Sequence, residues 1–178
     1  MFRSKYLDII ILLSLLVILI MFSNSYSLKK NKDIFNSPLI GTIFPDFSLR
    51  DLEGRYVSSE TLLNDESDIK VINFFASWCP SCLHEHSLIN AINNNLNIPI
   101  YGFAWKDNKY ELDKYLFENQ NPYKHVMQID NNIYMSQLLN IRYIPMSLVI
   151  DKDNKVIAHF KGPITSANFN YFLETQKP

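Results

Sequence analysis

The sequence contains little cysteine, little glycine and almost no excess charge. Among its 178 residues are 2 Cys and 4 Gly, and the formal net charge at pH 7 is −1. A nucleic-acid-binding domain normally shows a basic stripe, so this charge balance argues against that class. The two cysteines, Cys79 and Cys82, are three positions apart. A cross-link between them closes almost no loop and therefore does little to stabilise a fold.

The surroundings of the cysteines also lack what metal and haem sites need. A structural zinc site would require two further ligands at suitable spacing. His86 lies one helical turn beyond Cys82, whereas His84 faces elsewhere. A copper or zinc chaperone that uses Cys79, Cys82 and His86 stays open as an alternative of another class. Covalent haem attachment requires C-x-x-C-H, and position 83 is Leu. We predict no metal ligands and no soluble cofactor.

A long apolar run stands at the N-terminus. Ile9–Phe22 is broken only by Ser14, and Arg3 and Lys5 precede it. This pattern is typical of a signal peptide or a signal anchor. A full membrane span needs roughly 17 residues or more, a length that is reached when the segment starts at Tyr6. A clean A-x-A cleavage site is absent, so we predict an uncleaved anchor.

The export signal divides the chain into three parts. We predict a signal anchor over residues 1–27, a polar linker over 28–37 and one domain over 38–178. Either interpretation of the N-terminus, cleaved or anchored, places the domain in an oxidising compartment. Two neighbouring cysteines in an exported protein then point toward redox chemistry.

Strand and helix patterns alternate through the domain. The near-continuous apolar run Ile69–Ala76 is typical of a central strand buried on both faces, and a helix follows over Pro80–Leu96. We expect further strands at Phe44–Leu49, Tyr56–Val57, Ile98–Trp105, His125–Ile129, Ser147–Ile150 and Val156–Phe160, and further helices at Ser59–Leu63, Asn108–Asn119, Ile133–Leu139 and Ser166–Thr175. This order predicts an α/β fold with a mixed central β-sheet, flanking helices and an N-terminal β-hairpin extension.

The motif Trp78-Cys79-Pro80-Ser81-Cys82 lies between the buried strand and the helix that follows it, a position that favours a reactive cysteine. Cys79 stands at the N-terminus of the expected helix, where unpaired backbone N–H groups and the helix dipole favour thiolate over thiol. The thiolate is the species that attacks a disulfide. Cys82 would resolve the mixed disulfide, and Pro80 and Ser81 are expected to help set the reduction potential.

Two overlapping strings around the cysteines resemble a known family. The string VINFFASWCPSC at residues 71–82 resembles the thioredoxin superfamily. The string WCPSCLHEH at residues 78–86 resembles its DsbE/CcmG branch, anchored periplasmic reductants for cytochrome c maturation. The resemblance covers the chain from Pro38 onward and implies a thioredoxin-like fold. Further matches are GTIFPDFSL at 41–49, GFAWKD at 102–107, NPY at 121–123 and YIP at 143–145.

The resemblance implies a substrate groove beside the motif. Pro145 matches the cis-proline that faces the cysteines in this fold, and X–Pro bonds are the usual site of cis peptides. The family uses the backbone of the residue before it, here Ile144, to pair with a substrate strand. Trp78 is expected to shape the surface that a partner meets, and Trp105 matches a segment that lines the groove.

Three further positions are compared with the family. Thioredoxin has a buried Asp where this chain has Asn73, a neutral residue that the branch shares. Glu85 matches an acidic residue of the branch that would relay protons for Cys82, and a solvent-facing helix carboxylate is the alternative. After Pro145 the branch usually has Glu, whereas this chain has Met146. That departure bears on the choice of partner.

The function that the resemblance implies is disulfide reduction. The pair would reduce apocytochrome c or a cytochrome c maturation protein, and a membrane thiol reductant would serve as electron donor. The implied location is the inner membrane, single-pass, with the catalytic domain on the periplasmic side, and we expect a monomer. A general TlpA/ResA-like oxidoreductase with other clients is the alternative within the class. A peroxiredoxin is disfavoured because Asn73–Cys79 lacks the P-x-x-x-T-x-x-C frame.

Overall fold

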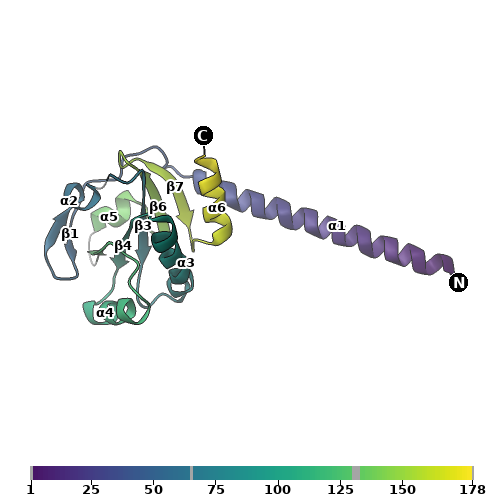
Figure 1. Cartoon of the computed structure of the whole chain (residues 1–178), viewed down its shortest axis with the longest axis horizontal. Helices are drawn as coiled ribbons and strands as arrows, with labels where there is room; N and C mark the ends of the chain where they lie inside the picture. Colours follow the sequence, from purple (N-terminus) through teal and green to yellow (C-terminus); the bar gives the residue numbers. More distant parts are fainter. Residues whose placement is uncertain (1, 65, 130–132, 178) are drawn as a thin grey trace. The chain divides into compact units, whose positions relative to one another are not determined.

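The computed structural model describes residues 2–64, 66–129 and 133–177. The chain forms two compact units, and the boundary between them in the sequence falls between Asp33 and Ile34. The helices are α1 (Phe2–Lys32), η1 (Asp33–Phe35, a 3-10 turn), α2 (Ser59–Leu63), α3 (Pro80–Leu96), α4 (Lys109–Glu118), α5 (Ile133–Leu138) and α6 (Ser166–Thr175). The strands are β1 (Ser48–Asp51), β2 (Tyr56–Ser58), β3 (Ile69–Phe75), β4 (Ile100–Trp105), β5 (His125–Ile129), β6 (Met146–Asp151) and β7 (Val156–Lys161) (Figure 1).

The first unit is the apolar helix α1. Its segment Tyr6–Tyr26 has 21 residues and is long and apolar enough to cross a membrane, judged by length and composition. The side chains of this segment are exposed, and a helix that is apolar on all sides is normally covered by protein or by lipid. We predicted a linker over 28–37, and α1 continues through the first half of it to Lys32.

The second unit begins within the segment that we assigned to the linker. Ile34 is buried in the core and Phe35 packs against the same cluster. The chain then runs along β7, where Ser37 Oγ lies 2.7 Å from His159 Nδ1 and Lys161 Nζ donates to the carbonyl of Asn36. Because residues 28–37 are mainly polar, we assigned them to a linker, although Ile34 and Phe35 pack against the core.

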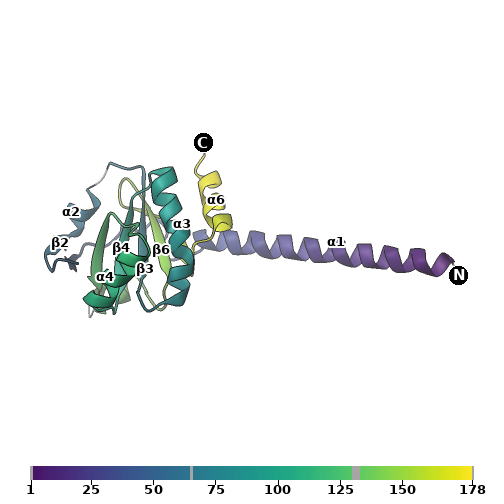
Figure 2. The ribbon, with the colours of Figure 1, turned by 60° about the horizontal axis from the view of Figure 1, so that its bottom comes forward.

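Seven strands form one mixed sheet in the order β2-β1-β5-β4-β3-β6-β7. β3, β4 and β5 are parallel. β6 pairs antiparallel with β3, and β7 pairs antiparallel with β6. The hairpin of β1 and β2 joins through an antiparallel pairing of β1 with β5. β3 lies well inside the sheet (Figure 2), and its side chains from Lys70 to Phe75 are buried. The predicted mixed sheet is confirmed.

Two apolar clusters cover the two faces of this sheet. One cluster joins α3, α4 and α6 to the sheet, with Ile89, Leu116 and Phe172 among its members. The other contains residues of α2 and α5, such as Leu62 and Met135. Since successive side chains of a strand point to opposite faces, β3 contributes to both clusters. Helices therefore flank the sheet on both sides, as the sequence pattern indicated.

The first strand lies later than predicted. We expected it over Phe44–Leu49, and the structure has β1 over Ser48–Asp51. Phe44 and Phe47 are buried in the second cluster, but their segment is irregular and contains Pro45. The alternation of apolar residues that suggested a strand arises because these side chains are buried. Pro45 has no N–H group to donate to a neighbouring strand, which disfavours a strand here.

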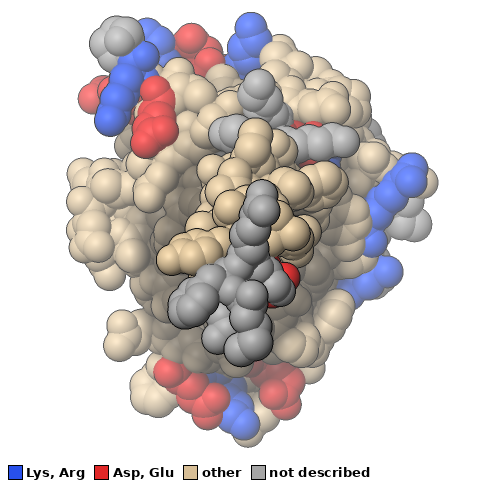
Figure 3. All heavy atoms as spheres, turned by 90° about the vertical axis from the view of Figure 1, so that its right-hand side faces the viewer, with Lys and Arg blue, Asp and Glu red and all other residues tan. Residues whose placement is uncertain are grey.

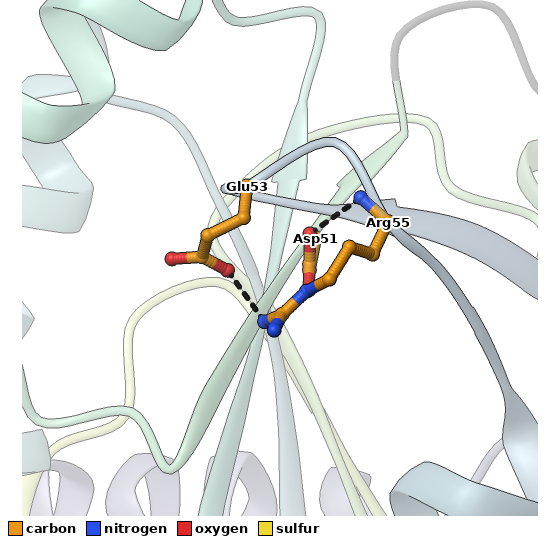
Figure 4. A network of polar contacts seen from close by, with 3 residues as sticks. All are labelled: Asp51, Glu53 and Arg55. Carbon is orange, nitrogen blue, oxygen red and sulfur yellow. Dashed lines mark hydrogen bonds and ion pairs between the residues drawn. The ribbon is translucent and has the colours of Figure 1, made fainter.

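Charged residues close the turn between β1 and β2. The backbone N–H and Nε of Arg55 donate to the two carboxylate oxygens of Asp51 at 2.8 and 2.7 Å (Figure 4). Arg55 also contacts Glu53 at 2.9 Å, and Gly54 adopts a positive φ of 79° that the tight turn requires. Figure 3 shows Lys and Arg side chains next to Asp and Glu side chains at the upper left and at the bottom of its view.

The buried imidazole of His159 makes stability sensitive to acid. Burial lowers the pKa of His159 to about 4, and the charge of Lys161 acts in the same direction. The histidine of an unfolded chain has a pKa of about 6.5, so between these values the unfolded chain binds a proton that the folded chain excludes. The contribution of His159 to the free energy of unfolding should therefore fall as pH drops from 6.5 towards 4.

Replacing His159 by Asn tests this expectation. His159→Asn keeps an amide near the position of Nδ1 but does not titrate. We expect the variant to lose up to about 1.4 kcal/mol per pH unit of the slope in this window. Guanidinium unfolding of the detergent-solubilised chain from pH 4 to 7 measures it, with the exposed His125→Asn as control. Equal slopes for His159→Asn and the parent chain would contradict the expectation.

Candidate active site

Both cysteines of the chain form one disulfide at the start of α3. Cys79 and Cys82 are linked, with their Cα atoms 5.3 Å apart. Cys79 is the N-cap residue of α3, and its Sγ accepts the N–H of Cys82 at 3.2 Å. Pro80 occupies the first helical turn, where its missing N–H has no intrahelical acceptor to lose. The pair therefore lies at the positive end of the helix dipole.

Exposed side chains surround two nearly buried cysteines. Cys79 is 5% exposed and Cys82 is 2% exposed, whereas Trp78 is 57% exposed. Pro80 and Ser81 are also exposed. A partner therefore meets Trp78, Pro80 and Ser81 first. Of the two sulfur-bearing residues, Cys79 is the more accessible, which suits it to be the one that exchanges with a partner.

The loop before the disulfide is held by the loop that follows β4. The carboxylate of Asp107 accepts both the backbone N–H and the hydroxyl of Ser77, at 2.5 and 2.7 Å. The indole N–H of Trp78 donates to the carbonyl of Lys106 at 3.0 Å. Lys106 has a positive φ of 49°. These contacts fix the two residues that directly precede Cys79.

The predicted cis-proline lies at the same end of the sheet as the cysteines. The Ile144–Pro145 peptide bond is cis, and Met146, the first residue of β6, pairs with Phe74 of β3. Because β3 leads into the disulfide loop, Pro145 is brought toward that loop. Ile144 packs against the cluster that contains both cysteines. Met146 is 1% exposed and packs on the opposite face, so this departure from the branch places a core side chain there.

Trp105 packs on the other face of the sheet. Its half-buried ring contacts the cluster that lacks the cysteines, and Lys106 Nζ lies 4.9 Å from the ring centroid. Its link to the disulfide loop runs through the backbone of Lys106, which holds Trp78. Contact of a substrate with Trp78, Trp105, Ile144 or Pro145 stays a prediction.

Glu85 is a buried carboxyl group on the first turns of α3. It is 3% exposed, and it lies three positions after Cys82. Its Oε1 accepts from Asn73 Nδ2 at 2.9 Å and its Oε2 accepts the N–H of Ile164 at 2.7 Å. Burial raises the pKa of Glu85 to about 7, and the two hydrogen bonds lower it in part. The solvent-facing alternative for Glu85 is therefore wrong, and the carboxyl group can exchange a proton near neutral pH.

Two residues of this buried network were not singled out from the sequence. Tyr123 O–H donates to Asn73 Oδ1 at 2.8 Å, and Ser147 Oγ accepts from Asn73 Nδ2 at 2.9 Å. Tyr123 belongs to the NPY string at 121–123, which matched the family without suggesting a role. Ser147 follows the cis-proline by two positions and alternates with core residues, so no local signal marks it.

His86 is engaged on both ring nitrogens. Nε2 lies 3.0 Å from the carbonyl of Gln120, which can only accept, so Nε2 carries the proton. Nδ1 then accepts the hydroxyl of Tyr115 at 3.0 Å. His86 is therefore not oriented to share a metal with the cysteines. Within the described part of the chain, no group of three or more His, Cys, Asp or Glu side chains is suited to hold a metal.

Most of the second unit matches a known protein family. Residues 39–173 match the family described as Redoxin, a range that includes the disulfide and the whole sheet. The chain belongs to the Redoxin family. It is a thiol–disulfide oxidoreductase. Cys79 and Cys82 are the only cysteines of its sequence.

Relatives and solved structures agree with this membership. The chain is 26% identical over 147 residues to the thiol:disulfide interchange protein DsbE homolog of Paracoccus denitrificans, covering 82% of this chain and 80% of the relative. It is 28% identical over 141 residues to DsbE of Vibrio cholerae, covering 77% and 73%. The fold is similar to the thioredoxin domain of a thiol-disulfide oxidoreductase from Bacteroides vulgatus, with a TM-score of 0.65, 17% identity and coverage of 79% and 100%.

Removing the carboxylate of Asp107 should destabilise the oxidised protein. Asp107→Ala leaves the N–H and hydroxyl of Ser77 without their acceptor, and such losses cost about 1–3 kcal/mol. Asp113→Ala is the control, since Asp113 makes an exposed ion pair with Lys109 that should contribute no more than about 1 kcal/mol. Denaturant unfolding compares the two. Equal losses would show that Asp107 is no more important than a surface carboxylate.

Proposed function

We propose that this chain is a membrane-anchored periplasmic reductase for disulfides of apocytochrome c or of a cytochrome c maturation protein. The observation that carries the proposal is the position of Cys79 and Cys82 at the start of α3, with the buried Glu85 close behind. The DsbE names of the relatives support the choice of client. The apolar α1 supports a single-pass anchor. We further propose that the protein acts as a monomer without a soluble cofactor.

The reaction is a pair of thiol–disulfide exchanges. The Cys79 thiolate attacks a client disulfide, forms a mixed disulfide with one client sulfur and releases the other as a thiolate. Cys82 then attacks Cys79 Sγ, which forms the internal disulfide and releases the second client sulfur. The client gains two electrons and takes up two protons. A membrane thiol reductant would return the Cys79–Cys82 pair to the dithiol by the same chemistry in reverse.

Glu85 would move the proton of Cys82 in this cycle. When Cys82 attacks, its thiol proton must leave, and when the disulfide is reduced Cys82 must take a proton up. A carboxyl group with a pKa of about 7 can serve in both directions near neutral pH, because a proton-transfer group works best when its pKa lies near the operating pH.

A second candidate is a general oxidoreductase of the TlpA/ResA kind with other clients. The buried Met146 favours it, since the branch usually carries Glu at this position and this chain replaces the charge by a core side chain. Client trapping separates the two candidates. It also separates both from the metal-chaperone alternative, which predicts no mixed disulfide.

Replacing Cys82 by Ser should trap the client. In Cys82→Ser the mixed disulfide on Cys79 has no internal thiol to resolve it, so covalent complexes accumulate in membranes of the producing cells. Non-reducing electrophoresis followed by mass spectrometry identifies the partner, and Cys79→Ser is the control that forms none. Apocytochrome c or a maturation protein among the partners supports the proposal. A broad set of unrelated exported proteins would favour the second candidate.

Replacing Glu85 by Gln should remove a pH dependence. When dithiothreitol attacks Cys79, Cys82 leaves and is protonated by neutral Glu85, so the rate per dithiothreitol thiolate should fall as pH rises through about 7. General acid catalysis typically contributes about 10²–10⁴-fold. Glu85→Gln should give a flat profile, whereas the control Glu111→Gln, on the surface of α4, should keep the fall. Parallel profiles for Glu85→Gln and the parent chain would exclude the relay.

A further inference from the structure

Two strands and the loop before β5 are connected to the carboxyl group of Glu85 through the side chain of Asn73. Asn73 of β3 donates from Nδ2 to Glu85 Oε1 and to Ser147 Oγ of β6, both at 2.9 Å. Its Oδ1 accepts the hydroxyl of Tyr123 at 2.8 Å. Asn73 and Ser147 are fully buried, Glu85 is 3% exposed and Tyr123 is 7% exposed. Both N–H groups and the oxygen of the amide thus make hydrogen bonds inside the core.

The chemistry of the partners fixes which way this amide points. An ionised carboxylate can only accept hydrogen bonds, so the NH₂ group of Asn73 must face Glu85. The carbonyl oxygen of the amide then faces Tyr123, which donates to it. A reversed amide would place its oxygen 2.9 Å from a carboxylate oxygen, and two acceptors at that distance repel. Tyr123 therefore stabilises the orientation of Asn73 that Glu85 needs.

Tyr123 is itself firmly placed. Its ring stacks on Phe75 with centroids 4.6 Å apart, and a Cβ at Gly102 would lie only 2.8 Å from Tyr123 Cγ, so the glycine makes room for the ring. The segment before it is tied to α3, where Asn93 Nδ2 donates to the carbonyl of Pro122 at 2.9 Å. Two further side chains of α3 bond to carbonyl groups of this segment: His86 to that of Gln120 and Asn90 to that of Asn119.

We propose that Asn73 is a positioning residue for Glu85, and that the hydroxyl of Tyr123 holds the Asn73 amide so that it donates to the Glu85 carboxylate. Together with the N–H of Ile164, the amide stabilises the charged form of a carboxyl group that burial would otherwise keep neutral. Asn73 thereby sets the pH at which Glu85 changes charge. The catalytic meaning of this setting rests on the proposed function, in which Glu85 relays a proton.

The titration of Glu85 can be told apart from that of the neighbouring tyrosines. Burial raises the pKa of Tyr115, and the charges of Glu85 and Asp107 raise it further. Burial also raises the pKa of Tyr123 well above its usual value, with Tyr115 and Glu85 adding to it. Both tyrosines therefore stay neutral between pH 5 and 9. In the oxidised protein Cys79 and Cys82 do not titrate, so a change in this range reports the carboxyl group.

Two tyrosines make a matched pair of variants. Tyr123→Phe keeps the stacked ring and removes only the hydroxyl that holds Asn73. Tyr115→Phe removes a hydroxyl of the same type that bonds His86 instead. The experiment follows the ¹³C signals of glutamate carboxyl groups in the oxidised full chain in detergent from pH 4 to 9. The signal of Glu85 is identified by its absence in Glu85→Gln.

We expect Tyr123→Phe to move the Glu85 midpoint upward and Tyr115→Phe to leave it in place. Asn73→Ala removes the donor itself and should move the midpoint up by about one pH unit or more, as expected for a hydrogen bond to a charged group. An unchanged or lower midpoint in Tyr123→Phe, or equal shifts in both tyrosine variants, would overturn the proposal. Thermal unfolding confirms that each variant is folded.

This titration is independent of the proposed function. It uses no client and no exchange reaction. If Cys82→Ser traps no partner while the Glu85 midpoint responds as expected, the proposed function fails and the positioning role stands. If clients are trapped and the midpoint does not respond to Tyr123→Phe, the positioning role fails alone.

Discussion

A helix that begins directly after a fully buried strand is the constraint on which this molecule depends. β3 is covered on both faces, so its position in the sheet is fixed by packing. The chain then enters α3 with Cys79 as N-cap. Unpaired N–H groups at a helix start favour a thiolate. Packing of an apolar strand thus decides where a reactive sulfur stands and what electrostatic environment it meets.

Behind this sulfur the core contains polar groups that satisfy one another. Glu85, Asn73, Tyr123 and Ser147 are joined by hydrogen bonds of 2.8 to 2.9 Å in a region with almost no exposure. Burying such groups without partners would cost several kcal/mol. With partners, the burial raises the pKa of the Glu85 carboxyl group to about 7, which is the property that the proposed proton relay needs.

Local patterns in the sequence predicted much of the fold and the position of the two cysteines. α3 follows from the motif and from apolar spacing, and its predicted bounds Pro80–Leu96 match the structure. The partners of Asn73 are 50 and 74 positions away in the chain, so no local pattern connects them. Burial of Ile34 within a polar segment, and of Glu85 on a helix with exposed neighbours, likewise depends on what packs against them.

If the Cys79–Cys82 pair works as a reductant, as we propose, its reduction potential must be low. The measurement equilibrates the full chain in detergent with glutathione or dithiol buffers and counts the reduced fraction. We predict a reduction potential at or below about −200 mV, in the range of glutaredoxins and thioredoxin. A potential near about −120 mV, as in a strong oxidant, would contradict it and indicate a protein that forms disulfides in its clients.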